Sequence, residues 1–449
     1  MAIKRGLMGK GQQLYRRARQ IIPGGTQLLS KRPEMFLPDQ WPSYYARAEG
    51  IRVWDLDGNQ YLDFTHFGVG SCVLGYSDPD VNNAVRNAIE SGVMSTLNCS
   101  EEVELAELLL ELHPWAEMVR FSRAGGEALA IAVRIARATT DREKIAFCGY
   151  HGWHDWYLSA NLADEKALDG HLLAGLTPAG VPRGLRGTLL PFHFNDTAEF
   201  RRIIADHGTE LAAVVMEPAR DSLPDPEFIQ TIRAETQRCG ALLIFDEVTS
   251  GWRLNTGGIH LTLGVQPDIA TFAKAMGNGY AISAIIGTRA AMDSAQKSFI
   301  SSTNWTERIG PVAALATIRK HRDLSVAKHL VQVGADVRRG WRQAAHEAGL
   351  RINLGGIEPL SHFSFDCADP VGAMTLFIQG MLDRGYLASG SFYSSFAHQP
   401  EDVHGYVEAV RVTFHDVARA LSAGDVRQRL RGGVKHSTFQ RLTDAAARR

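Results

Sequence analysis

Helical and extended patterns alternate along the middle of the chain. Between residues 81 and 148, amphipathic stretches with apolar side chains every three or four positions are separated by short apolar runs. Further short apolar runs, each stopped by polar residues, occur at 211–216, 241–245 and 269–273. Such runs are typical of buried strands, and their alternation with helices predicts a doubly wound α/β domain with a mostly parallel sheet.

Different patterns occupy the two ends of the chain. Residues 11–22 predict a helix that the Pro-Gly-Gly turn at 23–25 ends, and residues 52–64 alternate apolar and polar side chains around an Asp-Gly turn, which is typical of a β-hairpin. From about residue 319, helical stretches and short apolar runs predict a second, smaller α/β lobe. A cleft between two lobes would permit closure on a substrate.

Two charged side chains stand at the ends of predicted buried strands. Asp246 follows the apolar run at 241–245, and Lys274 follows the run at 269–273. The ligand crevice of a parallel sheet lies beyond the carboxyl ends of its strands, so this acid and this amine can meet across a pocket. The pair fits pyridoxal phosphate, whose aldehyde a lysine holds as a Schiff base while an aspartate keeps the pyridine nitrogen protonated. From spacing alone, a buried ion pair or two unrelated charges remain open.

The motifs around this pair occur in a characteristic order. They are DEV at 246–248, SGWR at 250–253, GVQPDIATFAK at 264–274 and GNG at 277–279. This series resembles the class III, or subgroup II, pyridoxal-phosphate aminotransferases, particularly the branch around glutamate-1-semialdehyde 2,1-aminomutase.

The resemblance implies fold type I, in which a large doubly wound α/β domain with a mostly parallel sheet is joined by a smaller α+β domain from both chain ends. We expect residues 1–75 and 319–449 to form the small domain and residues 76–318 to form the large, cofactor-binding domain. The resemblance further implies that Lys274 binds the cofactor and acts as general base and acid, and that Asp246 stabilises the electron-accepting ring.

Residues 122–128, SRAGGEA, connect a predicted strand to an alanine-rich helix. A helix that begins after a glycine turn offers free backbone N–H groups and the positive end of its dipole to a phosphate, although the segment alone could be an ordinary turn. The resemblance aligns it with the family's Ser-Gly-Thr-Glu-Ala block and implies that Gly125 and Gly126 bind the cofactor phosphate. Ala124 replaces the serine and Gly126 the threonine, so backbone N–H groups must serve instead of hydroxyl groups.

Three further residues match family positions around the cofactor ring. Tyr150, just beyond the run at 144–148, is expected to stack on the pyridine ring, and Val248 to pack against the opposite face. Glu217 follows the run at 211–216 and is expected near the ring hydroxyl. The alternative for Glu217 is a capping or solvated acid.

Residues 301–313 resemble the family block whose threonine reaches the phosphate bound by the neighbouring subunit. Thr306 is the matching position, which implies shared active sites and a homodimer. A helix N-cap is the alternative role for Thr306.

Substrate-binding groups are expected near the N-terminus. In the aminomutase branch, the segment after the Pro-Gly-Gly turn binds the substrate carboxylate, and Lys31 and Arg32, with Ser30, are the candidates in this chain. An exposed basic loop is the alternative. Arg411 is one possibility for an arginine that binds the donor carboxylate, although no spacing identifies it.

Composition narrows the classes of partner. The net charge of −1 over 449 residues gives no electrostatic footprint for nucleic acid or a membrane surface, which leaves small molecules and copies of the chain itself. No apolar run nears the roughly 20 residues that span a bilayer, and no apolar stretch follows the basic N-terminus, so we expect a cytoplasmic protein. The five cysteines are odd in number and form no CxxC pair, so neither a disulfide framework nor a zinc site is expected.

A metal site is the competing interpretation of the segment after residue 148. His151, His154 and Asp155 are usable ligands at short spacing. No third histidine or carboxylate stands at a recognisable interval, so we expect no metal.

The predicted activity is transfer of an amino group. Segments 23–36, 95–109, 150–162 and 305–311 resemble the branch of aminotransferases that forms 8-amino-3,8-dideoxy-manno-octulosonate. That resemblance implies L-glutamate as donor and an 8-oxo sugar acid as acceptor, in lipopolysaccharide precursor synthesis. A glutamate-1-semialdehyde aminomutase is the alternative within the fold. A binding or regulatory protein that kept the fold, and a metal-dependent hydrolase using His151 and His154, are the alternatives from other classes.

Overall fold

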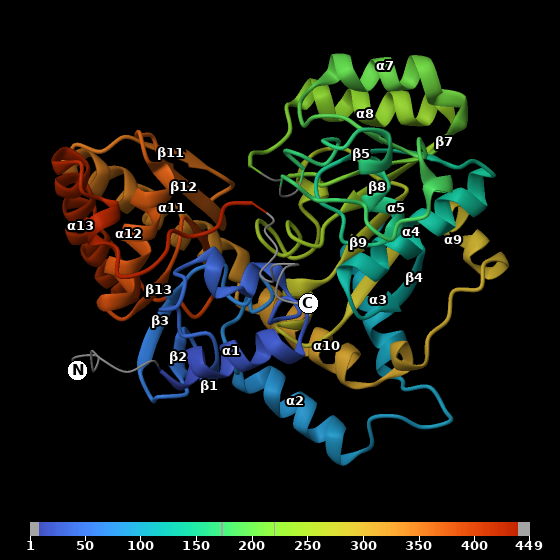
Figure 1. The fold of residues 1–449 in the computed structure, drawn as a ribbon. Coiled ribbons are helices and arrows are strands. Elements are labelled where there is room, and N and C mark those ends of the chain that lie inside the picture. The colour runs from blue at the N-terminus through green and yellow to red at the C-terminus, as the bar shows by residue number, and fades with distance from the viewer. Residues whose placement is uncertain (1–8, 172–173, 220, 439–449) are drawn as a thin grey trace. The chain divides into compact units, whose positions relative to one another are not determined.

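The computed structural model describes residues 9–171, 174–219 and 221–438 and contains two compact units (Figure 1). The larger unit comprises Gly70–Val73 and Asp78–Lys328. The smaller unit comprises the described parts of Met1–Val69, Leu74–Ser77 and His329–Arg449, so it is built from both ends of the chain.

A seven-stranded sheet in the order β4-β10-β9-β8-β7-β5-β6 forms the centre of the larger unit. Neighbouring strands are parallel except that β10 runs antiparallel to both β4 and β9, which agrees with the predicted mostly parallel sheet. The strands are β4 (Met118–Ser122), β5 (Lys144–Cys148), β6 (Leu189–Pro191), β7 (Leu211–Met216), β8 (Leu242–Asp246), β9 (Ile269–Phe272) and β10 (Ser283–Gly287).

Helices cover both faces of this sheet, because successive side chains of each strand point to opposite faces. Ile145 and Phe147 of β5 join the core cluster that contains α4, whereas Ala146 joins the cluster that contains α7 and α8. Figure 1 shows α7 and α8 packed side by side over their face. The longer helices are α2 (Pro79–Glu90), α3 (Glu101–Leu112), α4 (Gly125–Thr140), α7 (Thr197–His207), α8 (Pro226–Cys239) and α10 (Ile309–Asp323).

Short helices lie mainly in the connections that follow the strands. They are α5 (Asp155–Leu158), α6 (Ala160–Ala163) and α9 (Arg289–Met292), together with the 3-10 turns η5 (Ile259–Thr262), η6 (Lys274–Gly277) and η8 (Thr303–Thr306). The connections after the parallel strands β5, β8 and β9 emerge at the edge where a ligand binds in a parallel sheet, so they carry most of the candidate site.

The smaller unit contains two short sheets with helices packed around them. One has the order β1-β2-β3-β13, and the pairing of Leu62 in β3 with Tyr386 in β13 joins the two chain ends. The other has the order β11-β12-β14. The strands are β1 (Tyr45–Glu49), β2 (Arg52–Asp55), β3 (Gln60–Phe64), β11 (Ile352–Gly355), β12 (Leu360–Phe365), β13 (Tyr386–Ala388) and β14 (Ser391–Tyr393). The helices are α1 (Lys10–Ile21), α11 (Val326–Ala348), α12 (Pro370–Asp383) and α13 (Pro400–Ala423), with the 3-10 turn η1 (Leu29–Lys31).

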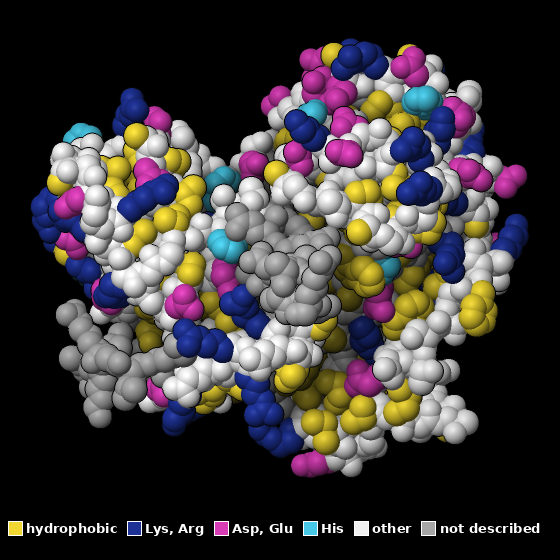
Figure 2. All heavy atoms as spheres, viewed as in Figure 1, with side chains coloured by type: hydrophobic (Ala, Val, Ile, Leu, Met, Phe, Trp, Pro, Cys, Tyr) yellow, Lys and Arg dark blue, Asp and Glu magenta, His cyan; other side chains and the backbone are white. Residues whose placement is uncertain are grey.

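The surface carries both signs of charge. Over α7 and α8, side chains of Lys and Arg are mixed with those of Asp and Glu (Figure 2). Within the described ranges, no helix combines the length and the apolar character needed to cross a membrane.

Candidate active site

The carboxylate of Asp246 is held from two sides at the end of β8. Only 3% of Asp246 is exposed, and its Oδ2 atom lies 2.8 Å from Nδ1 of the buried His151. Its Oδ1 atom accepts a hydrogen bond of 3.0 Å from the Val248 N–H. The second ring nitrogen of His151, Nε2, lies 3.1 Å from the Cys148 carbonyl oxygen. Carboxylate and carbonyl oxygens both accept hydrogen bonds, so the His151 ring lies between two acceptors and fixes the direction of the Asp246 carboxylate.

Lys274 is positioned by a strained turn directly after β9. Its φ angle of 43° lies in the left-handed region, which is costly for a residue with a side chain and occurs most often at functional sites. The Lys274 Nζ atom donates a 2.7 Å hydrogen bond to Thr249 Oγ1. Because Asp246 pairs with Thr271 across β8 and β9, the lysine and the aspartate leave neighbouring strands at the same edge of the sheet. We call Asp246, His151, Lys274 and Thr249 the strand-end cluster.

The predicted phosphate turn packs against the residues that follow β5 and β8. A Cβ atom at Gly125 would lie 2.8 Å from Val248 Cγ1, and one at Gly126 would lie 3.0 Å from His154 Nδ1. The first distance is too short for a side chain and the second is tighter than most side-chain contacts, so glycine at each position permits the close approach. The Glu127 carboxylate accepts from the backbone N–H groups of Arg123 and Ala124 at 2.9 and 3.0 Å, which fixes the entry into α4.

This turn fits an anionic group such as a phosphate. Gly125 and Gly126 are the first two residues of α4, a helix of 16 residues, so their N–H groups lie at the positive end of its dipole. The backbone of both residues is free of a Cβ that would cover it. Together with the buried acid Asp246 and the amine of Lys274, the described residues provide the groups that pyridoxal phosphate requires.

Glu217 holds the backbone of the predicted stacking residue. Its Oε2 atom accepts a 3.0 Å hydrogen bond from the Tyr150 N–H, and a Cβ at Gly149 would lie 2.5 Å from the same oxygen. Burial raises the pKa of the Tyr150 hydroxyl, and the charges of Asp246 and Glu217 raise it further. Tyr150 is therefore a neutral phenol at neutral pH.

A cavity of about 250 Å³ adjoins this position. Its lining comes from the ends of β5 and β7 and from the segments after β6 and around residue 170. The residues are Cys148, Gly149, Gly170, His171, His193, Phe194, Glu217 and Asp221. The cavity therefore shares Glu217 with the predicted site and reaches Gly149, the residue before Tyr150.

A buried polar network fastens the loop that carries Val248 and Thr249. Glu247, which is fully buried, accepts from His260 Nδ1 at 2.8 Å, from the His260 N–H at 2.9 Å and from Ser250 Oγ at 2.6 Å. Trp115 Nε1 donates to His260 Nε2 at 2.9 Å, so His260 carries its proton on Nδ1. Arg253 donates from Nε to the Thr249 carbonyl oxygen at 3.2 Å and from its guanidinium to the Gly70 carbonyl oxygen, so it also binds this loop.

Thr306 lies on an exposed turn of the larger unit. Its hydroxyl donates to the Thr303 carbonyl oxygen at 3.0 Å, within η8. The next residue, Glu307, is bound by Arg123, whose guanidinium donates to the Glu307 carbonyl oxygen at 2.5 Å and lies 3.5 Å from its carboxylate. Arg123 thus links the Thr306 segment to the chain just before Gly125.

The predicted substrate-binding residues belong to the smaller unit. Lys31 is exposed at the end of η1, and Arg32 follows it with its guanidinium close to Gly24. Arg411 is paired with Glu408 at 2.7 Å on α13. The roles of these residues in substrate binding stay predictions.

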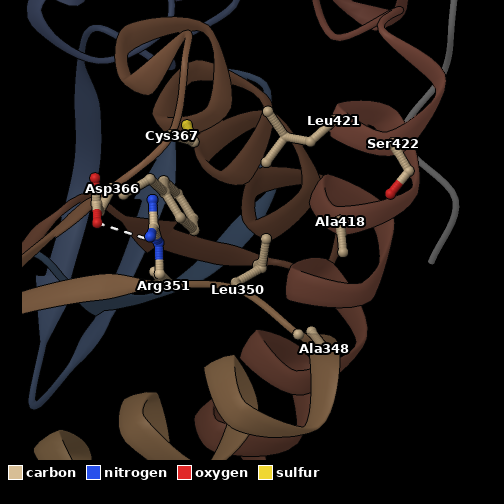
Figure 3. A pocket seen from close by; sticks show the side chains of 10 residues that line it. Ala348, Leu350, Arg351, Asp366, Cys367, Ala418, Leu421 and Ser422 are labelled. Atoms are coloured by element: carbon tan, nitrogen blue, oxygen red, sulfur yellow. Dashed lines mark ion pairs between the residues drawn. The ribbon is translucent and has the colours of Figure 1, made fainter.

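Figure 3 shows a pocket of about 200 Å³ in the smaller unit, beside the Arg351–Asp366 ion pair of 3.2 Å. None of the predicted site residues lines it. Its lining consists of Ala348, Gly349, Leu350, Arg351, Phe365, Asp366, Cys367, Ala418, Leu421 and Ser422.

Sequence reasoning missed three features of the site. It weighed His151 and His154 only as metal ligands, whereas His151 binds Asp246 and His154 packs on Gly126. Across the part of the chain that the structure describes, no three His, Cys, Asp or Glu side chains are arranged to hold a metal ion. It also gave no role to Thr249. The only available signal for His151 was its position next to Tyr150, just beyond β5.

Comparison with known sequences finds similar proteins over nearly the whole chain. The family model described as aminotransferase class-III matches residues 38–352. The 3-aminobutyryl-CoA aminotransferase of Cloacimonas acidaminovorans is 32% identical, over 92% of this chain and 99% of that protein. The 2'-deamino-2'-hydroxyneamine transaminase of Streptomyces kanamyceticus is 32% identical, over 85% and 93%. The glutamate-1-semialdehyde 2,1-aminomutase of Desulforamulus reducens is 32% identical, over 91% and 98%.

Solved structures with the same fold also match nearly the whole chain. The FumI protein of Sphingopyxis sp. MTA144, in its PLP internal aldimine form, superposes with a TM-score of 0.83 at 27% identity, over 92% of this chain and 98% of that chain. An omega-transaminase from Sphaerobacter thermophilus superposes with a TM-score of 0.81 at 28% identity, again over 92% and 98%. The predicted type I fold is confirmed by these matches.

Proposed function

Because the chain belongs to the class III aminotransferases, we propose that it moves the amino group of L-glutamate to the aldehyde of a sugar acid, 3,8-dideoxy-8-oxo-manno-octulosonate. The predictions of a pyridoxal-phosphate-dependent aminotransferase and of its cofactor are confirmed. The alternatives of a regulatory binding protein and of a metal-dependent hydrolase are therefore not supported. The observation that carries the proposal is the strand-end cluster, which places a buried acid and a positioned amine at one edge of the sheet.

Different residues of the larger unit are proposed to bind different parts of the cofactor. We assign the phosphate to Gly125 and Gly126, the ring faces to Tyr150 and Val248, and the ring nitrogen to Asp246. The packing of Val248 on Gly125 supports the assignment, because it places the phosphate turn beside the loop that follows Asp246. The hydrogen bond from Tyr150 to Glu217 supports a role for this acid at the same edge.

Lys274 binds the cofactor and transfers the proton in the proposed reaction. When bound, pyridoxal phosphate supplies an aldehyde that takes up amino groups and a ring that stabilises negative charge on the neighbouring carbon. The Lys274 amine would hold this aldehyde and, when the donor takes its place, would move a proton from the donor's α-carbon to the former aldehyde carbon of the cofactor. With the acceptor bound, it would move a proton from that carbon to the acceptor carbon. Thr249 orients the amine, and His151 holds the carboxylate of Asp246, which would bind the ring nitrogen of the cofactor.

Overall sequence identity to known proteins does not identify the amino acceptor of this chain. The three relatives named above carry three different substrates in their names and are each 32% identical to this chain. The sugar-acid acceptor, and with it a role in lipopolysaccharide synthesis, rests on the resemblance of segments 23–36, 95–109, 150–162 and 305–311. An aminomutase acting on glutamate-1-semialdehyde is the second candidate, because such an enzyme aligns with 91% of this chain.

Two assays on the purified holoenzyme separate these candidates. With L-glutamate and the 8-oxo sugar acid, we expect formation of 2-oxoglutarate and of the 8-amino sugar, both detected by mass spectrometry. With glutamate-1-semialdehyde alone, we expect no 5-aminolevulinate. The opposite pair of results would replace the proposed transamination by the aminomutase reaction.

We also propose a homodimer in which Thr306 of each subunit reaches the cofactor phosphate of its partner. The exposed position of Thr306 supports this, and its hydroxyl lies 3.4 Å from the sulfur of Met94, which is itself exposed. Further exposed apolar side chains occur nearby in the chain, at Ile89, Leu97 and Val103, and a second subunit would cover such a surface.

A further inference from the structure

The ring of His154 occupies the space in which a side chain at position 126 would stand. A Cβ atom added to Gly126 would lie 3.0 Å from His154 Nδ1 and 3.1 Å from His154 Cε1. His154 precedes α5 as its N-cap, and the indole of Trp153 stacks on it with the ring centres 4.6 Å apart. The imidazole is therefore held against the first turn of α4.

The same position distinguishes this chain from the family pattern. The phosphate turn reads Ala-Gly-Gly where the family block has Ser-Gly-Thr, so both hydroxyl groups that could contact a phosphate are absent. A Cβ atom at position 126 would lie closer to His154 than side chains usually approach, so a threonine there would require the ring to shift. The pair of Gly126 and His154 therefore stands where the family block has a threonine with its hydroxyl group.

The Nδ1 atom of His154 is available to a ligand bound at the start of α4. Its Nδ1 atom is buried and has no hydrogen-bond partner among the described residues, which is unusual for a polar atom inside a protein. Burial lowers the pKa of His154, against the opposing effect of the Glu127 and Asp155 carboxylates. An anion bound at the start of α4 would accept a hydrogen bond from Nδ1 and would favour the protonated ring.

We propose that His154 donates a hydrogen bond from Nδ1 to the cofactor phosphate and so takes the place of the hydroxyl group that a threonine at position 126 would provide. The inference rests on the proposed function, because it takes the turn at Gly125 and Gly126 as the phosphate site. It adds a phosphate-binding residue that comes from the segment after β5 instead of from the turn itself.

The test compares binding of pyridoxal phosphate with binding of pyridoxal, which has the aldehyde and the ring but no phosphate. Cofactor-free enzyme is titrated with each compound. The dissociation constant of pyridoxal divided by that of pyridoxal phosphate measures what the phosphate contributes to binding. For His154→Leu we expect this ratio to fall about 10-fold or more, as for removal of a hydrogen bond to a charged group, with pyridoxal binding unchanged. His154→Asn places an amide near the position of Nδ1 and is expected to recover most of the ratio.

A reciprocal exchange sharpens the test. In Gly126→Thr/His154→Ala, the removed ring makes room for the threonine, and its hydroxyl is expected to restore the ratio that His154→Ala lowers. An unchanged ratio in His154→Leu would overturn the inference and leave the proposed function standing. If His154→Leu bound both compounds more weakly by the same factor, the ratio would also stay unchanged and His154 would be a packing residue. If the unmodified protein bound neither compound, the proposed function itself would fail.

Discussion

His151 Nδ1 and Asp246 Oδ2 lie 2.8 Å apart, although β5 and β8, the strands that deliver them, are separated in the sheet by β7. The histidine spans this gap with a side chain that is almost fully buried and anchored at Nε2 by the Cys148 carbonyl oxygen. Asp246 is thereby fixed in direction and supplied with a hydrogen-bond donor. The acid that should face the cofactor ring depends on a residue with no direct part in the reaction.

Replacing His151 by phenylalanine should keep the ring volume and remove both hydrogen bonds. Since a hydrogen bond to a buried charged group is worth roughly 1.5–3 kcal/mol, we expect kcat to fall about 10-fold to 100-fold with a near-native circular dichroism spectrum. Steady-state kinetics with L-glutamate measure the effect. A variant with unchanged kcat at every pH would show that Asp246 does not need this support.

Thr249→Val should test whether the hydrogen bond from Lys274 matters. Valine has the shape of threonine but cannot accept from Nζ, so the 2.7 Å hydrogen bond that orients the amine is removed. We expect kcat to fall about 10-fold while KM for L-glutamate changes little. Thr249→Ser is the matched control, because it keeps the hydroxyl and should retain most of the activity. Equal rates for the valine and serine variants would remove Thr249 from the mechanism.

Thr306→Ala should weaken retention of the cofactor, provided that the threonine serves the partner's site. We expect the dimer to persist and the dissociation constant of pyridoxal phosphate to rise about 10-fold, because one hydrogen bond to a charged phosphate is removed. Thr303→Ala in the same turn is the control, since the contact of Thr303 with Thr306 uses the backbone carbonyl. The same dissociation constant in both variants would place Thr306 outside the site.

His398 should make the stability of the protein depend on pH. It is fully buried between Asp63 and Ser395 backbone groups, and burial lowers its pKa from 6.5 to about 4. Between these values the unfolded chain binds a proton that the folded chain does not, so stability is full above pH 6.5 and falls as the pH drops toward 4.

The corresponding measurement is chemical denaturation of the protein and of His398→Gln. Lowering the pH from about 7.5 to about 5.5 should cost the parent about 1.4 kcal/mol more than the variant, which lacks this one titrating group. His404→Gln changes an exposed histidine in α13 and should keep the parent's pH dependence. Identical pH dependence in His398→Gln and the parent would contradict the assignment.

Local patterns were sufficient to predict β7, β8 and β9 of the larger unit and to place Asp246 and Lys274 at the ends of β8 and β9. Short apolar runs ended by polar residues marked the strands, and Asp246 and Lys274 followed directly from the ends of β8 and β9. The resemblance placed Val248 and Gly125 at one cofactor, and the two residues lie in contact. These features depend on residues close together in the chain or on a known order of motifs.

The contacts that sequence reasoning missed depend on the three-dimensional order of strands and on exact turn geometry. The bond between His151 and Asp246 requires β5 and β8 to flank β7, which no local pattern records. The Lys274 that donates to Thr249 also has a left-handed backbone, which is uncommon for a residue other than glycine and leaves no local pattern in the sequence. The packing of His154 on Gly126 joins two segments whose glycine and histidine are each unremarkable alone.

The visible absorbance spectrum, recorded before and after L-glutamate is added without an acceptor, tests the central claim most directly. The protein should show the band of a lysine-bound cofactor, L-glutamate should remove it, and the 8-oxo sugar acid should restore it. Lys274→Ala should fold but show neither this band nor turnover. A protein without the band even after addition of pyridoxal phosphate, or a Lys274→Ala variant with near-normal turnover, would contradict the account.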